Sequence, residues 1–138
     1  MIRKMSLFMA TMLAIVAFAL TPGTAMAQSY SGNWPATVTH SQHSNGTYCL
    51  TLTDNGTDGW PHSGPATIVG SGLFGTFQVI NGTLVVTIEV QGGTGQNAGL
   101  LFIASASNGK IGKGVYEDVF GGEDFDSGAL AVGTKDGC

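Results

Sequence analysis

Basic residues are almost missing from this chain after residue 27. From residue 28 onward there is no arginine and no methionine, and the only lysines are Lys110, Lys113 and Lys135. Nine carboxylates accompany these three lysines, so residues 28–138 carry a formal charge of −6. A nucleic-acid binder needs a basic surface that neutralises phosphates, so the scarcity of cations excludes that class. It also argues against docking on anionic membranes.

Long apolar runs are missing too, apart from one near the N-terminus. Met-Ile-Arg-Lys is followed by an apolar stretch of 14 residues from Leu7 to Leu20, and then by Ala25-Met26-Ala27. A basic start, a short apolar stretch and a small-residue cleavage motif are typical of a secretory signal peptide. Because a membrane-spanning helix needs ~20 apolar residues, we expect residues 1–27 to be removed rather than to stay as an anchor. Residues 28–138 are then a single secreted or periplasmic domain without membrane attachment.

Cysteine occurs only twice, as Cys49 and as Cys138 at the end of the sequence. An even pair in an oxidising compartment predicts a disulfide, which here would close a loop spanning 89 positions. Side-chain alternation over residues 47–53 places Cys49 on the outward face of a strand, where the C-terminal cysteine can reach it.

Glycine, in contrast, is abundant and falls between short runs rich in Val, Ile, Thr and Phe, which is typical of strands joined by tight turns. Four Asn-Gly pairs, beginning at Asn45, Asn55, Asn81 and Asn108, favour type I′ hairpin turns. The first three are also N-glycosylation sequons, although turn chemistry is a sufficient reason for them.

The clearest hairpin covers Leu73 to Gln91. A two-residue turn at Asn81-Gly82 sets Phe77 opposite Val86 and Val79 opposite Leu84. That face is wholly apolar and the other is mixed, so one face is expected to cover a core.

Further strands are predicted over residues 36–40, 47–53, 66–70, 99–106, 111–119 and 128–133, with a bulge at a glycine where 99–106 pairs with 111–119. No segment from residue 28 onward shows the spacing of apolar residues that is typical of an amphipathic helix. Eight strands in sequential hairpins predict an all-β domain, an antiparallel up-and-down eight-stranded barrel, with an antiparallel β-sandwich as the alternative. The interior of such a barrel is filled by side chains or holds one small ligand.

Gly32-Asn33-Trp34 opens the first strand of this meander, and it resembles the G-x-W start of calycin barrels, the lipocalins and avidin-like proteins. The resemblance implies a binding barrel whose base is closed by Trp34. Lipocalins also pack a late arginine across this tryptophan, and no arginine follows position 3 here.

Trp60 lies between Asp58 and His62 in a loop predicted over residues 54–64. A half-exposed tryptophan beside an acid and an imidazole suits a sugar or another small ligand, so these three residues are the candidate ligand-binding residues. The alternative is that Trp60 caps the core from its loop.

Five carboxylates gather in a predicted acidic loop between residues 117 and 126. Because they repel one another, a hard cation would stabilise them, and Glu123, Asp124 and Asp126 are candidate Ca²⁺ ligands. The simpler alternative is that they are solvated loop acids. We expect no other cofactor. His40 and His43 are expected on opposite faces, as surface or loop imidazoles rather than metal ligands.

These features favour a secreted, non-catalytic β-barrel that binds a small molecule or a glycan. One alternative is a small secreted enzyme that uses the acidic 117–126 loop with His62 as its acid–base partner. Another is a structural or surface-interaction protein, which would show an exposed apolar patch or an open edge strand. No feature of the sequence indicates an oligomeric state.

Overall fold

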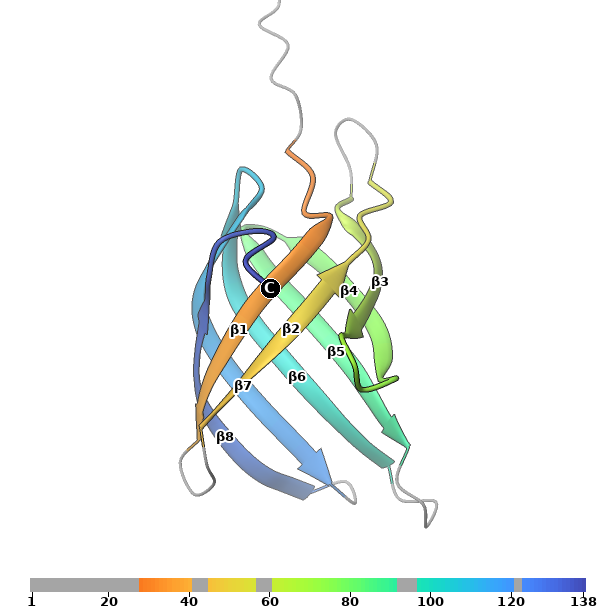
Figure 1. Cartoon of the computed structure of the whole chain (residues 1–138), viewed down its shortest axis with the longest axis vertical. Coiled ribbons are helices and arrows are strands. Elements are labelled where there is room, and N and C mark those ends of the chain that lie inside the picture. Colours follow the sequence, from red (N-terminus) through yellow and green to blue (C-terminus); the bar gives the residue numbers. More distant parts are fainter. Residues whose placement is uncertain (1–27, 41–44, 57–60, 92–96, 121–122) are drawn as a thin grey trace, which may run out of the picture.

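The computed structural model describes residues 28–40, 45–56, 61–91, 97–120 and 123–138, which form a closed eight-stranded antiparallel barrel (Figure 1). The strands are β1 (Gly32–His40), β2 (Gly46–Leu52), β3 (Ser63–Ile68), β4 (Phe74–Ile80), β5 (Thr83–Gln91), β6 (Asn97–Ser107), β7 (Lys110–Phe120) and β8 (Glu123–Val132). Each strand pairs with the next, and β8 pairs with β1. The predicted barrel is confirmed, and the sandwich alternative is wrong.

The predicted signal peptide, residues 1–27, lies outside the described residues. Within the described ranges, no helix has the length and apolarity to cross a membrane.

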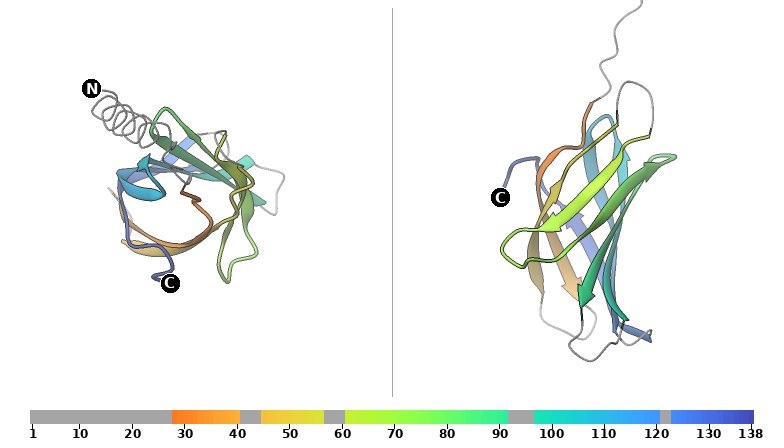
Figure 2. Two further views of the ribbon diagram at one scale, coloured as in Figure 1. Left: turned by 90° about the horizontal axis from the view of Figure 1, so that it is seen from above. Right: turned by 90° about the vertical axis from the view of Figure 1, so that its right-hand side faces the viewer.

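Strand β1 distinguishes the two ends of the barrel. It begins near Trp34 at the upper end in Figure 1, here named the Trp34 end, and finishes at His40 at the lower end, here named the His40 end. Because the strands alternate in direction, β2, β4, β6 and β8 all finish at the Trp34 end. Figure 2 views the barrel from the Trp34 end and from the side.

The β4–β5 hairpin has the predicted register, with Phe77 opposite Val86 and Val79 opposite Leu84. Asn81 and Gly82 have φ values of 49° and 75°, as a type I′ turn requires. Gly75 permits the close approach of the two strands, because a β-carbon there would lie 1.8 Å from the carbonyl oxygen of Thr87.

Only two of the four Asn-Gly pairs form positive-φ turns. Asn108-Gly109 does so between β6 and β7, with φ values of 50° and 69°. Asn45 and Asn55 do not, because Gly46 is already the first residue of β2 and Asn55 belongs to a longer connection to β3. The predicted irregularity in this pairing is confirmed: the β6–β7 register shifts between Ala104, which is opposite Gly114, and Ala106, which is opposite Ile111.

Apolar side chains from all eight strands fill the interior. The largest of those that are less than 2 % exposed are Tyr116, Phe102, Leu50 and Leu52. Tyr30 and Trp34 close the Trp34 end, where the indole Nε1 of Trp34 donates a hydrogen bond of 2.9 Å to the Tyr30 carbonyl. Where these buried residues lie, the interior of the barrel is filled by the protein's own side chains.

The acidic segment is a pair of strands, so its prediction as a loop is wrong. β7 continues to Phe120 and β8 starts at Glu123, with Asp118 directly opposite Asp126. Acidic residues have low strand propensity, which is why the sequence predicted a loop, but cross-strand pairing overrides that preference here.

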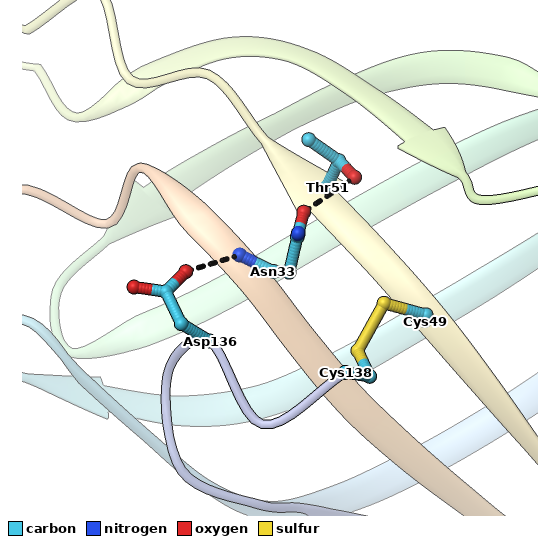
Figure 3. The surroundings of a disulfide bond; sticks show 5 residues. All are labelled: Asn33, Cys49, Thr51, Asp136 and Cys138. Atoms are coloured by element: carbon cyan, nitrogen blue, oxygen red, sulfur yellow. Dashed lines mark hydrogen bonds between the residues drawn. A yellow bond between two sulfur atoms is a disulfide. The ribbon is translucent and has the colours of Figure 1, made fainter.

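The predicted disulfide between Cys49 and Cys138 is present, with Cα atoms 5.9 Å apart (Figure 3). After β8 the chain turns along β1, where Gly133 N donates to the Pro35 carbonyl and Asn33 N donates to Asp136 Oδ1 at 3.0 Å. The bond therefore fixes the C-terminal tail, residues 133–138, across β1 to the outer face of β2.

Candidate functional site

Of the three predicted ligand-binding residues, the structure describes His62, whereas Asp58 and Trp60 lie outside the described residues. His62 immediately precedes β3 at the Trp34 end, and its side chain is 26 % exposed. Its imidazole meets the ring of Tyr30 edge-on, with centroids 5.1 Å apart.

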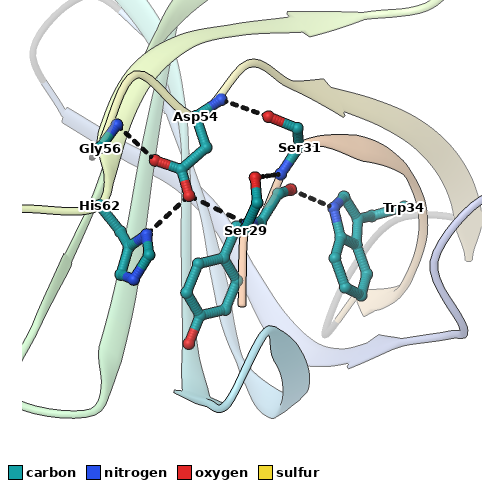
Figure 4. A network of polar contacts seen from close by, with 7 residues as sticks. Ser29, Ser31, Trp34, Asp54, Gly56 and His62 are labelled. Atoms are coloured by element: carbon teal, nitrogen blue, oxygen red, sulfur yellow. Dashed lines mark hydrogen bonds and ion pairs between the residues drawn. The ribbon is translucent and has the colours of Figure 1, made fainter. Parts of the chain in front are cut away.

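Asp54 fixes the orientation of His62 (Figure 4). Asp54 Oδ2 lies 2.7 Å from His62 Nδ1 and also accepts a hydrogen bond from Tyr30 N at 3.0 Å. Its other oxygen, Oδ1, accepts from Gly56 N at 2.9 Å. With Nδ1 directed at a carboxylate, Nε2 is the imidazole atom left for a ligand, and no described residue bonds to it.

The Asp54 carboxyl group is buried, which by itself would raise its pKa. Hydrogen bonds from Tyr30 N, Gly56 N and His62 outweigh this effect, so the pKa of Asp54 lies below its ordinary value. The Asp54 side chain is therefore an anion. It holds together the segment before β1, the start of the β2–β3 connection and His62.

Asp54 should make the protein sensitive to acid. Because its pKa is lower in the folded state, its carboxylate contributes stability above the unfolded value of ~3.9, and that contribution is lost as pH falls through the folded value. We expect Asp54→Asn to lower the free energy of unfolding at pH 7 by about 1–3 kcal/mol and to flatten its decline between about pH 5 and pH 2. Urea unfolding across that pH range measures both effects.

Glu89→Gln, which removes one exposed carboxylate from β5, is the control for the change in net charge. A slope in Asp54→Asn equal to that of the wild type would contradict the prediction.

The structure does not bring the acidic segment to His62. Glu123 and Asp124 begin β8 at the His40 end, and their side chains lie outside the described part of the chain, whereas His62 and its acidic partner Asp54 lie at the Trp34 end.

The histidine that the acidic segment does meet is His40. Its Nδ1 lies 2.8 Å from Asp126 Oδ2, and the two side chains are 8 % and 1 % exposed. The prediction of a surface imidazole is wrong for His40, and the solvated-acid alternative is wrong for Asp126. Both residues continue the inward side of their strands, His40 after Val38 and Asp126 before Leu130.

Two tyrosines complete this cluster at the His40 end. The Tyr116 ring meets His40 edge-on at 5.1 Å, and its hydroxyl lies 3.4 Å from that of Tyr48. Burial, the Tyr48 hydroxyl and the carboxylates of Asp118 and Asp126 together raise the pKa of Tyr116 well above its ordinary range. Tyr116 therefore stays a neutral hydrogen-bonding group.

The described residues contain no group of three or more His, Cys, Asp and Glu side chains arranged to hold a metal. Of the three candidate Ca²⁺ ligands, only the Asp126 side chain is described, and it faces His40. Calcium binding at Glu123, Asp124 and Asp126 stays a prediction.

An open groove of about 470 Å³ lies on the outer face of β3, β4 and β5 and starts at Ser63, the residue after His62. Its hydrogen-bonding side chains are uncharged, namely those of Ser63, Thr76, Gln78 and Thr87. The side chains of Thr76, Gln78 and Thr87 are exposed. The alternation of each strand explains this surface, because the neighbouring residues Phe77, Val86 and Ile88 point into the core.

Comparisons of this chain with protein-family models, with curated proteins and with solved structures give no match.

Proposed function

We propose that this protein is a secreted, non-catalytic binding module that recognises a glycan or another neutral small molecule in the groove beside His62. The groove over β3, β4 and β5 is the observation that carries this proposal, because its volume of about 470 Å³ lies in the range of small-molecule sites. Its hydroxyl and amide groups both donate and accept hydrogen bonds, which suits a ligand rich in hydroxyl groups.

The interior of the barrel is a weaker candidate for a ligand site. Calycin barrels, which the G-x-W pattern at Gly32 to Trp34 resembles, bind ligands inside the barrel. Here Phe102, Val86 and Ile88 are each 0 % exposed, so the middle of the barrel leaves no space for a ligand against these side chains. We therefore favour the outer face.

Binding is favoured over catalysis by the chemistry of the groove. Glycoside hydrolysis uses a pair of carboxyl groups flanking the scissile bond, and none of the described residues that line the groove is Asp or Glu. The His40–Asp126 pair has acid–base character, but both side chains are at least nine-tenths buried.

The predicted export of the protein is consistent with a binding function outside the cytoplasm. The features of residues 1–27 predict a signal peptide, and the Cys49–Cys138 disulfide is of a kind that persists in oxidising compartments. Asp58 and Trp60 stand four and two positions before His62 in the sequence, and we propose that they extend the site.

The proposal is tested by screening the exported protein on a glycan array and against a library of neutral metabolites by thermal shift. A ligand at 100 times its Kd should stabilise the protein by about 2.7 kcal/mol. Thr76→Val and Gln78→Ala should each weaken binding of a confirmed ligand about tenfold, because each removes a hydrogen bond worth about 1 kcal/mol or more.

Thr37→Val is the matched control, since Thr37 is also exposed, on the outer face of β1. Trp60→Ala tests the predicted aromatic contact. The proposal fails if no neutral ligand binds, or if a ligand binds equally well to Thr76→Val, Gln78→Ala and the wild type.

A further inference from the structure

Two adjoining cavities of about 610 Å³ each open at the Trp34 end, and neither shares a lining residue with the groove beside His62. They share Gln28, Lys110 and Ile111. One of them, here named the tail cavity, lies between the start of β7 and the C-terminal tail. Trp34, Ile111 and Val132 supply its apolar lining.

The charged side chains that line the tail cavity are opposite in sign to the formal charge of residues 28–138. Two of the three lysines after residue 27, Lys110 and Lys135, line it, although residues 28–138 carry a formal charge of −6. None of the described residues that line either cavity is Asp or Glu. Neither lysine forms an ion pair with a carboxylate among the described residues.

We propose that the tail cavity binds an amphipathic anion, a small molecule with an apolar body and one carboxylate or sulfonate group. The apolar body would pack against Ile111 and Val132, and the anionic group would lie between the ammonium groups of Lys110 and Lys135. Thr134, at the same cavity, supplies a hydroxyl donor. This site goes beyond the proposed glycan groove and shares no lining residue with it.

The Cys49–Cys138 disulfide gives this cavity one of its walls. Gly133, Thr134 and Lys135 form that wall, and they belong to the tail that the disulfide holds against β1 and β2. A free C-terminal segment would otherwise tend to be disordered. Binding at the tail cavity should therefore depend on the oxidised bond.

The test uses the exported protein and 8-anilinonaphthalene-1-sulfonate, an aromatic sulfonate whose fluorescence rises on binding. Lys110→Gln and Lys135→Gln should each raise its Kd about threefold, and the double variant about tenfold, as expected for ion pairs of exposed lysines. Lys113→Gln is the matched control, because Lys113 is exposed on β7 but lines neither cavity.

Four further measurements identify the site and the ligand class. Decanoate should displace the probe and decanol should not, and binding should weaken as salt is raised. Phe74→Ser controls for probe binding to the exposed Phe74 on β4, and should leave the Kd unchanged. Cys49→Ser/Cys138→Ser should lose most of the binding under conditions where circular dichroism shows the barrel intact.

Equal binding to wild type and to Lys110→Gln/Lys135→Gln would overturn the inference, as would displacement by decanol as effective as by decanoate. Gln78→Ala should leave the probe unaffected, so failure of the tail cavity and failure of the glycan groove are separate outcomes.

Discussion

Replacing both Cys49 and Cys138 by serine is expected to lower the free energy of unfolding by about 2–5 kcal/mol. The loop that the bond closes spans 89 positions, for which the loss of chain entropy in the unfolded state is about 4.5 kcal/mol as an upper figure. For a domain of this size the melting temperature should fall by about 4–6 °C per kcal/mol. Thermal unfolding followed by circular dichroism measures the change.

The wild-type protein in excess reductant is the control, because it lacks the bond but keeps both side chains. It should melt together with the double serine variant. A double variant that melts within about 2 °C of the oxidised wild type would contradict the prediction.

Asp126→Ala is expected to destabilise the barrel by about 3–5 kcal/mol. The substitution removes the carboxylate that lies 2.8 Å from His40 Nδ1, inside a barrel end where both side chains are at least nine-tenths buried. It leaves the imidazole without that partner and opens a small void beside Tyr116. Urea unfolding at pH 7 measures the loss.

A double-mutant cycle separates the pair from the void. His40→Leu/Asp126→Ala should lose clearly less than the sum of the two single variants, because neither polar group is then left behind. Glu117→Ala, on the same hairpin, controls for loss of an acidic side chain and should change stability by no more than about 0.5 kcal/mol. Additive losses at His40 and Asp126 would show that the two residues are not coupled.

Local patterns predicted most of the fold. The β4–β5 hairpin follows from its turn and its alternation, since Asn81-Gly82 fixes the register and the apolar set Phe77, Val79, Leu84 and Val86 selects the inner face. The outward position of Cys49 follows from the same alternation. Asn45 and Asn55 show the limit of a dipeptide signal, because the length of each connection depends on where the next strand begins.

Strand propensity does not predict the polar cluster at the His40 end, whereas the alternation of side chains along the strands does. His40 continues the inward series of Trp34, Ala36 and Val38, and Asp126 stands four positions before the buried Leu130. The strand at 128–133 in fact starts at Glu123, and this extension places Asp126 on the inner face. That β1 and β8 then become neighbours follows only from closure of the barrel.

The candidate groove beside His62 is partly readable from sequence. The neighbours of His62 in the sequence indicate its role, but they do not indicate that of Asp54, because a carboxylate eight positions away gains its role only when the β2–β3 connection folds back. The tail cavity combines residues from the segment before β1, from β7 and from the tail, which no local pattern brings together.

The position of the disulfide has a consequence for proteolysis. Residues 49 to 138 form a covalent ring that contains the end of β2 and all of β3 to β8. A protease that cuts once anywhere within this ring leaves a nicked barrel whose fragments stay joined. Strand β1 is the exception, since it lies outside the ring, and one cut between His40 and Cys49 would leave it attached by hydrogen bonds and packing alone.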